Sequence, residues 1–381
     1  MEKQMIDDAI FITGMQRSGT TLLERLLASQ SGVSLLSQPF PLLFVEAKRA
    51  FLRFIGGGDD LFPLGHLLLE GRYSRRSFAT WLREWRISSD DLDDLFARMQ
   101  SYSGQYTRFE PETVACASAT IEADDDFAEV LHKLVRGLAR PAGARWVGSK
   151  ETVCEEYLPL LLERGFRCAI IIRDPRDVVA SLNHGRGQEF GGALKPTLFN
   201  VRNWRKSVAF ALAMEKHPRF FWCRYEDLVT NPARELSRLG NSLAIGDFDA
   251  GALDGDIRDS RGVIWPGNSS HLEVVRGVSS SSVGAFRNVL PPEVATLVEA
   301  ACLPELRLLG YETTLSVADS IRAISGYSEP YEITRPGMER DTATPENLGV
   351  EIERLDRLNA AGSEEWFLFE SVREQLTEGM R

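Results

Sequence analysis

Ile10-Phe11-Ile12-Thr13-Gly14-Met15-Gln16-Arg17-Ser18-Gly19-Thr20-Thr21 is the stretch that decides the fold, together with the apolar residues at 22, 23, 26 and 27 that follow it. The first apolar positions are typical of a buried parallel strand, and the later ones have the spacing of one helical face. In a strand–loop–helix unit, backbone N–H groups and the positive end of the helix dipole converge on one point, which glycine lets a ligand approach closely. The stretch therefore predicts an anion site, to which Arg17, Thr20 and Thr21 add donors for phosphate oxygens.

The loop between Gly14 and Gly19 has the spacing of a P-loop but lacks its lysine. Thr20 occupies the position at which that motif carries the lysine for the β- and γ-phosphates. The loop therefore favours a nucleotide whose reacting group is not a magnesium-bound γ-phosphate. Two alternatives stay open for this motif alone, a P-loop kinase and a plain strand-to-helix connector.

The composition is that of an ordinary globular protein with an acidic balance. The chain has 381 residues and a formal net charge of −11, so a broad nucleic-acid-binding surface is not expected. The polar start of the chain and the lack of a long apolar run predict a cytoplasmic protein without a membrane span. Scattered cysteines, and histidines without ligand spacing, predict free thiols and no metal site.

Strand-like and helix-like segments alternate through the middle of the chain. Short apolar runs at 146–150, 168–172 and 220–223 are each followed by a helical pattern, which is typical of a doubly wound, mostly parallel α/β sheet. We expect one domain over 1–315, with a helical insertion at about 52–145 and a partly helical C-terminal extension at 316–381. The extension either packs on the domain or supports a homo-oligomer. The aromatic residues of the insertion have a spacing that favours core packing over a substrate pocket; they are Trp81, Trp85, Tyr102, Tyr106 and Phe109.

A second motif, Arg173-Asp174-Pro175-Arg176-Asp177-Val178-Val179-Ala180-Ser181, follows the apolar run at 168–172. Arg173 stands at the end of a predicted strand and Ser181 lies two turns into the next helix, so both side chains can reach one anion at the carboxyl edge of the sheet. A solvated ionic turn is the alternative for this motif alone. Two anion sites on one sheet edge indicate a nucleotide with phosphates at both ends of its ribose.

The two motifs together resemble those of the sulfotransferase family, which transfers a sulfuryl group from 3′-phosphoadenosine 5′-phosphosulfate (PAPS). The RSGTT loop is similar to the family's 5′-phosphosulfate loop, and RDPRDVVAS to its 3′-phosphate strand and helix. The segments 225–228 (YEDL) and 284–288 (GAFRN) resemble two further family segments, and Lys150 resembles the family's strand-end lysine. The resemblance covers about residues 9 to 312 and implies a P-loop-like sulfotransferase fold. The PAPS contacts that it implies are Gln16, Arg17, Ser18, Gly19, Thr20, Thr21, Arg173, Ser181, Tyr225, Ser282 and Arg287.

The resemblance also implies a mechanism in which the protein supplies charge rather than a covalent intermediate. The sulfuryl group would pass in line to a hydroxyl or nitrogen acceptor on a small molecule, carbohydrate or peptide, and PAP would leave. Arg17 and Lys150 are expected to stabilise the charge that develops on the oxygens, without a metal. Residues 279–281, all serine, replace a family Arg-Lys-Gly segment, so 3′-phosphate binding is expected to depend more on Arg173 and Arg287.

The catalytic base is the residue that the resemblance defines least. The two positions at which family members carry a base are occupied here by Gln38 and Thr152, and neither side chain accepts a proton at neutral pH. Glu46 and His66 are the candidates that we expect to replace them, and Glu151 is a further one. The missing base also leaves a second class of function open, a non-catalytic protein that binds PAP.

Overall fold

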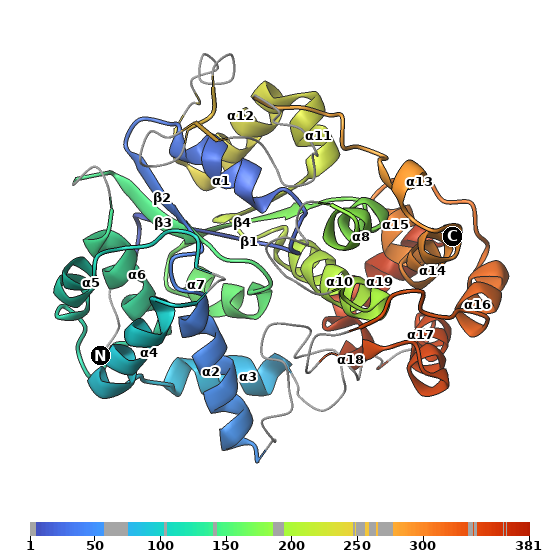
Figure 1. Cartoon of the computed structure of the whole chain (residues 1–381), viewed down its shortest axis with the longest axis horizontal. Coiled ribbons are helices and arrows are strands. Elements are labelled where there is room, and N and C mark those ends of the chain that lie inside the picture. Colours follow the sequence, from blue (N-terminus) through green and yellow to red (C-terminus); the bar gives the residue numbers. More distant parts are fainter. Residues whose placement is uncertain are drawn as a thin grey trace.

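A parallel β-sheet forms the centre of the protein (Figure 1). The computed structural model describes residues 5–56, 75–102, 105–139, 143–185, 194–246, 248, 256–258, 264–265, 277–333, 338, 341–360, 362 and 364–381. In these residues five strands pair in the order β2-β3-β1-β4-β5, and every neighbouring pair runs parallel. The strands are Ala9–Thr13 (β1), Val33–Ser37 (β2), Trp146–Lys150 (β3), Arg167–Ile172 (β4) and Phe220–Arg224 (β5). The expected doubly wound α/β fold is confirmed.

The strand order places β1 at the point where the chain changes direction across the sheet. From β1 the chain runs outward to β2 and back to β3, and it then crosses to the other side of β1 to form β4 and β5. Ile10 of β1 is in register with Gly148 of β3 on one side and with Arg167 of β4 on the other. Ligands of such sheets bind beyond the carboxyl ends of the strands at this switch point. The loop after Thr13 therefore lies where a site is expected.

Both faces of the sheet are buried under helices. Successive strand residues point to opposite faces, so they belong to different apolar clusters. Phe11 and Ile170 belong to one apolar cluster, whereas Ile12 and Ile171 belong to a second one. Helices α1, α11 and α12 cover the second face, and α2, α6, α7 and α10 contribute to the first (Figure 1). Their bounds are Thr20–Ala28 (α1), Pro41–Phe54 (α2), Phe127–Gly137 (α6), Leu158–Glu163 (α7), Thr197–Met214 (α10), Tyr225–Thr230 (α11) and Pro232–Leu243 (α12). A 3₁₀ turn, Glu155–Tyr157, precedes α7, and α8 (Pro175–Asn183) follows β4.

The described residues between α2 and β3 form mainly helices, in line with the expected helical segment. Besides α6 it contains Arg75–Glu84 (α3), Ser89–Met99 (α4) and Pro111–Ser118 (α5). Trp81 packs on Phe51 with ring centroids 5.5 Å apart, and Trp85 packs on Phe127 at 6.1 Å. These two tryptophans are partly buried and pack against the hydrophobic core, in line with their helical spacing. Tyr106 differs from them, because its ring is 54% exposed.

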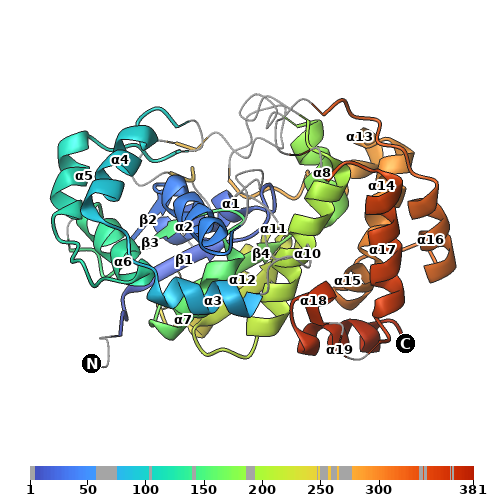
Figure 2. The ribbon, with the colours of Figure 1, turned by 90° about the horizontal axis from the view of Figure 1, so that it is seen from below.

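The helices after residue 315 pack on the domain at the end of the molecule opposite to α4 and α5 (Figures 1 and 2). Arg202 and Arg205 of α10 form ion pairs with Glu351 at 2.7 and 2.6 Å, and Arg354 pairs with Glu305. The helices at this end are Phe286–Val289 (α13), Pro292–Ala301 (α14), Leu303–Leu308 (α15), Val317–Ser325 (α16), Pro345–Arg357 (α17), Glu364–Phe367 (α18) and Glu370–Gly379 (α19). The domain boundary at 315 and self-association stay predictions.

The described elements that the sequence patterns did not predict include β2 and α16. β2 is a short edge strand with two serines in Val33-Ser34-Leu35-Leu36-Ser37, so its apolar pattern is weak. α16 begins in acidic, serine-containing sequence, where Ser316 and Asp319 form a capping box.

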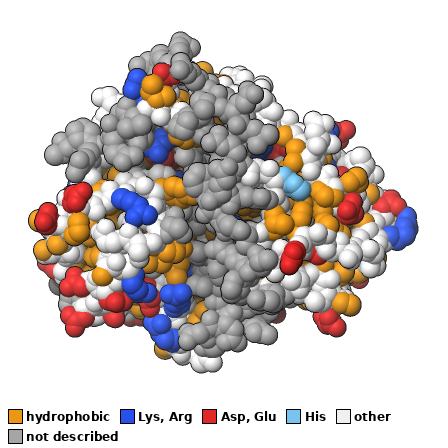
Figure 3. All heavy atoms as spheres, in the orientation of Figure 1, with side chains coloured by type: hydrophobic (Ala, Val, Ile, Leu, Met, Phe, Trp, Pro, Cys, Tyr) orange, Lys and Arg blue, Asp and Glu red, His pale blue; other side chains and the backbone are white. Residues whose placement is uncertain are grey.

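All five cysteines are free, and four of them are buried. Among the described residues, no helix has both the length and the apolar character that a membrane crossing requires. On the face shown in Figure 3, the described acidic and basic side chains are interspersed with apolar ones.

Candidate functional site

The loop between β1 and α1 turns sharply at its two glycines. Gly14 and Gly19 have φ angles of 141° and 101°, a backbone conformation that side chains rarely allow. A Cβ atom on Gly19 would lie 2.5 Å from Cδ2 of Tyr225, so the loop rests directly on the tyrosine ring. α1 begins at Thr20, which places Thr20 and Thr21 in its first turn, where the backbone N–H groups have no intrahelical partner.

Buried donors without partners line this loop. Arg17, which has a left-handed φ of 69°, donates from Nε to Oγ of Ser181 at 3.0 Å. The Nη2 atom of Arg17 and the Oγ atom of Ser18 are buried, and within the described part of the chain neither has a hydrogen-bond partner. Burial lowers the pKa of Arg17 to about 10, and Arg173 acts in the same direction, whereas Tyr106 opposes the shift. Because unsatisfied buried donors are costly, the arrangement fits an anion held by the loop.

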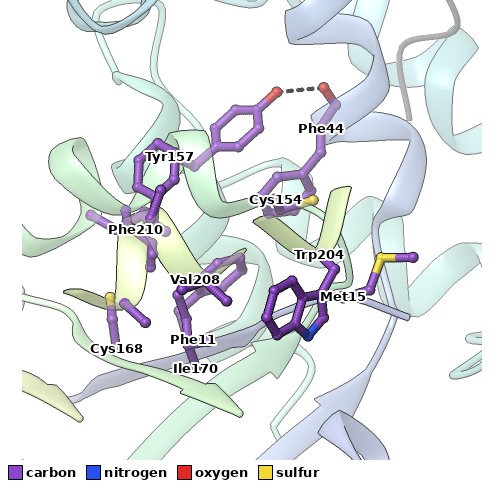
Figure 4. Close-up of a cluster of buried hydrophobic side chains, with 14 of the residues drawn as sticks. Phe11, Met15, Phe44, Cys154, Tyr157, Cys168, Ile170, Trp204, Val208 and Phe210 are labelled. Carbon is purple, nitrogen blue, oxygen red and sulfur yellow. Dashed lines mark hydrogen bonds between the residues drawn. The ribbon is translucent and has the colours of Figure 1, made fainter. Parts of the chain in front are cut away.

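One residue of the loop, Met15, anchors it in the hydrophobic core. The Met15 side chain is 1% exposed and lies in the same buried cluster as Trp204 of α10, as the close-up in Figure 4 shows. Trp204 in turn donates from Nε1 to the backbone oxygen of Arg173 at 2.7 Å. A single helix, α10, therefore contacts both the loop after β1 and the residue after β4.

The segment after β3 connects the loop to a buried ion cluster. The backbone N–H of Val153 donates to the oxygen of Gly14 at 3.0 Å. Val153 has a φ of 61°, which is strained for a β-branched residue. Its carbonyl accepts from Lys48 and Lys206, each at 3.2 Å, and both lysines pair with Glu156. The buried lysines thus hold the strained turn, which in turn contacts the loop after β1.

Arg173 lies directly after β4 and is buried against the same loop. It donates from Nη2 to the oxygen of Ser282 at 2.6 Å and from Nη1 to the oxygen of Arg17 at 3.3 Å. Its guanidinium lies 4.7 Å from the centroid of the Tyr225 ring, and the Tyr225 hydroxyl is 2.9 Å from Oγ of Ser282. The structure therefore brings together Arg17, Ser181, Arg173, Tyr225 and Ser282, as expected from the sequence.

Residues 284–287 are held against α8 by a carboxylate. Asp177 accepts from the backbone N–H groups of Gly284 at 2.7 Å and Phe286 at 2.9 Å. The neighbouring Arg287 is exposed and forms an ion pair with Glu312 at 2.9 Å. Its predicted contact with a 3′-phosphate stays a prediction.

Lys150 ends β3, on the other side of β1 from Arg173. Its Nζ donates to Oε1 of Gln38 at 2.9 Å and lies 5.4 Å from the centroid of the Tyr106 ring. Burial lowers the pKa of Lys150 to about 8, although Glu24 and Glu151 act in the opposite direction. A glutamine that cannot accept a proton thus contacts the strand-end lysine.

The three base candidates have different surroundings. Glu46 lies on α2 and forms ion pairs with Arg53 at 2.8 Å and Arg98 at 3.6 Å. Neither partner belongs to the loop after β1 or to β3. Glu151 is buried and accepts from the N–H of Phe40 at 3.0 Å, and burial raises its pKa to about 8. His66 lies outside the described residues.

Two residues at the site were not singled out by the sequence patterns. Lys195 donates from Nζ to Oε1 of Gln16 in the loop, and Asp177 holds the segment that follows Ser282. Lys195 precedes Pro196 at the start of α10, after a glycine-rich stretch, and this is a weak signal for a ligand contact. Asp177 is part of the RDPRD sequence, but its partners lie more than a hundred residues away.

The fold and the site define a P-loop-like α/β protein. Two neighbouring groups of hydrogen-bond donors lie at the carboxyl edge of its sheet, where they could bind anions. A family model described as the sulfotransferase family matches residues 9–249. The chain therefore belongs to the sulfotransferase family. A comparison with curated proteins found no match.

Several solved structures are similar to this chain at low sequence identity. The sulfotransferase domain from the curacin biosynthetic pathway is 19% identical with a TM-score of 0.42, and the match covers 82% of this chain and 100% of that chain. The sulfotransferase domain from the Synechococcus PCC 7002 olefin synthase is 18% identical, with a TM-score of 0.44 and coverages of 84% and 94%. Retinol dehydratase in complex with androsterone and inactive cofactor PAP is 15% identical, with a TM-score of 0.34 and coverages of 81% and 83%. The family assignment rests on the family model, and the fold class on this chain's own strand order.

Proposed function

We propose that the protein transfers the sulfuryl group of PAPS to a hydroxyl or nitrogen acceptor and releases PAP. The observation that carries this proposal is the hydrogen bond from Arg17 to Ser181, which joins the loop after β1 to the helix after β4, while Nη2 of Arg17 and Oγ of Ser18 have no partner in the described chain. Donors for a 5′-phosphosulfate and a 3′-phosphate are thus adjacent at one sheet edge. Membership of the sulfotransferase family supports the same assignment.

The chain's residues would act mainly by stabilising charge. PAPS supplies the activated sulfuryl group; the acceptor atom bonds to sulfur as the bond from sulfur to the bridging oxygen breaks, and the acceptor proton goes to a base. Arg17 lies in the loop after β1 and Lys150 at the end of the neighbouring β3, and both would stabilise negative charge on the bridging and equatorial oxygens. One well-placed donor of this kind contributes about 3–4 kcal/mol to the transition state.

Glu46 and His66 remain our candidates for the base. Glu46 has two arginine partners in the structure, so we rank His66 first and test both. A base of this type supplies a factor of roughly 10²–10⁴ in rate. We therefore expect His66→Ala or Glu46→Gln to lower kcat by that order while PAP affinity is kept. Wild-type turnover in both variants would contradict this assignment.

Ligand identity is the first experiment. PAP should raise the melting temperature without added metal, because a ligand at a hundredfold excess over its Kd adds about 2.7 kcal/mol to the free energy of unfolding. ATP with magnesium should raise the melting temperature much less. Equal stabilisation by ATP, or a requirement for magnesium, would contradict the proposal and favour a P-loop kinase. PAP release from PAPS with a panel of small-molecule, carbohydrate and peptide acceptors then separates an enzyme from a non-catalytic PAP-binding protein. A cytoplasmic location is part of the same proposal, in line with the free, mostly buried cysteines.

A further inference from the structure

A second cation reaches the phosphate loop from outside both nucleotide motifs. Lys195 is 9% exposed, and its Nζ donates to Oε1 of Gln16, the residue before Arg17. This contact places a lysine ammonium at hydrogen-bond distance from the side chain that precedes Arg17 in the loop. A charged oxygen is a stronger acceptor than a glutamine amide. An anionic ligand in the loop would therefore compete with the Gln16 amide for Lys195.

The backbone of Lys195 is fixed to the end of α8. Its carbonyl accepts from Nδ2 of Asn183 at 3.0 Å, and its N–H donates to Oδ1 of the same side chain at 3.3 Å. Asn183 is the last residue of α8, the helix that carries Ser181, and it is 1% exposed. The position of Lys195 is therefore set by the same helix that contributes to the 3′ side of the predicted nucleotide site.

The C-terminal extension holds the other side of Lys195. Two residues further on, Thr197 begins α10, and its N–H and hydroxyl both donate to the carboxylate of Glu329, at 2.8 and 3.0 Å. The Tyr327 hydroxyl is 3.0 Å from both Oγ1 of Thr197 and Oε1 of Glu329. A carboxylate at a helix N-terminus is favoured by the helix dipole. Residues 327–329 thus fix the start of α10.

Residue 331 extends this contact to α8. The Tyr331 hydroxyl lies 2.8 Å from Nε2 of His184, the residue that caps α8. The segment 327–331 therefore touches the chain at 184 and at 197, on both sides of Lys195. It lies beyond residues 9–249, which the family model matches. Lys195 itself lies inside that range, so a residue of the matched region is positioned by a segment outside it.

We propose that Lys195 binds the 5′-phosphate side of the nucleotide and that residues 327–331 of the C-terminal extension hold it in place. This inference rests on the proposed function, because it requires a nucleotide in the loop. It gives the extension a role in substrate binding besides its packing on α10. Lys195 is the binding residue, and Glu329 is a positioning residue that acts through it.

The first test measures ligand affinity by calorimetry on the full chain, with Lys195→Met and the charge-conserving Lys195→Arg. Lys195→Met should weaken PAP binding roughly 10- to 100-fold, because a charged contact is lost, and Lys195→Arg should recover most of the affinity. Binding of 3′-AMP, which lacks the 5′-phosphate, should be the same in all three proteins. Equal PAP affinity in Lys195→Met and wild type, or equal losses for PAP and 3′-AMP, would overturn the inference. A wild-type chain that does not bind PAP would instead overturn the proposed function, and with it this inference.

The second test asks whether Glu329 acts through Lys195. Glu329→Ala should weaken PAP binding roughly 3- to 10-fold in the wild-type background and have no further effect in the Lys195→Met background. Arg322→Gln removes an exposed ion pair with Asp319 in the same extension, and it is the matched control that should leave PAP affinity unchanged. An undiminished effect of Glu329→Ala in the Lys195→Met background would show that Glu329 affects PAP binding independently of Lys195 and would overturn its positioning role.

Discussion

Buried arginines occur in two regions of this protein with opposite surroundings. In the extension interface, Arg202 and Arg205 both face the carboxylate of Glu351, at 2.7 and 2.6 Å. At the loop after β1, Arg17 contacts a serine hydroxyl, and its Nη2 atom has no partner in the described chain. The comparison teaches that the same side chain is structural where a carboxylate is supplied and available for a ligand where it is not.

The pKa values follow the same division. Burial alone would raise the pKa of Glu351, but Arg205 and Arg202 outweigh this effect and lower it to about 2. For Arg17, burial dominates and lowers the pKa to about 10. A bound phosphate or sulfate would supply the negative charge that Arg17 lacks as a partner. The extension interface is therefore stable without a ligand, whereas ligand binding would stabilise the loop.

Removal of the extension's carboxylate should have the largest effect. Glu351→Gln removes the carboxylate that two buried guanidinium groups share; Arg202 keeps Asp341 at 3.0 Å, whereas Arg205 loses its ion pair. We expect a loss of about 3–5 kcal/mol in the free energy of unfolding. Urea denaturation measures it. Glu353→Gln on the same helix removes an exposed pair with Arg357 and should cost no more than about 0.5 kcal/mol. Equal stabilities of the two variants would show that the paired arginines contribute little.

The acid dependence of stability should report the same carboxylate. The pKa of Glu351 is lowered from 4.5 to about 2, so the unfolded chain takes up a proton first as the pH falls. Its contribution is fully present above about pH 4.5 and is lost toward about pH 2, a change of roughly 3 kcal/mol. Denaturation curves across this range should show a shallower acid loss for Glu351→Gln than for wild type. Parallel curves would contradict the assigned pKa.

Substitution of the loop arginine should lower ligand affinity rather than the stability of the ligand-free chain. Arg17→Met removes a buried cation whose Nη2 has no described partner, so PAP affinity should fall by about 1.5–3 kcal/mol. The unfolding free energy of the ligand-free chain should not fall, because no buried ion pair is broken. Calorimetry measures the PAP affinity, and urea denaturation of the same samples measures the unfolding free energy without ligand. A large loss of ligand-free stability would place Arg17 with the structural arginines.

Arg287 should give the smallest effect, because it is paired but exposed. Its partner Glu312 is also exposed, so Arg287→Gln should change stability by less than about 1 kcal/mol. If it contacts the 3′-phosphate, PAP affinity should fall by no more than about 5-fold, and affinity for AMP, which lacks that phosphate, should not change. An equal loss for AMP and PAP would argue against a 3′-phosphate contact.

The sequence was informative where a feature depends on neighbouring residues. The loop from Gly14 to Thr21 and the turn at Asp174, whose side chain accepts from the N–H of Arg176, are set by contacts within a few residues. β2 was not apparent, because its strand character comes from pairing with β3, more than a hundred residues away. The position of Tyr106 beside Lys150 likewise follows from the N–H of Tyr106, which donates to the oxygen of Gln38 at 3.2 Å.

By itself, the sequence determined the α/β class and the residues of the two predicted anion motifs, because residue type and short-range spacing fix backbone conformation and donor chemistry. The absence of both usual bases followed from the family resemblance. Only the tertiary structure decided which cations have partners. Glu351 meets Arg202 across 149 positions, Glu329 meets Thr197 across 132, and Lys195 meets Gln16 across 179. Such contacts depend on how helices and strands pack, and no local pattern in the chain encodes them.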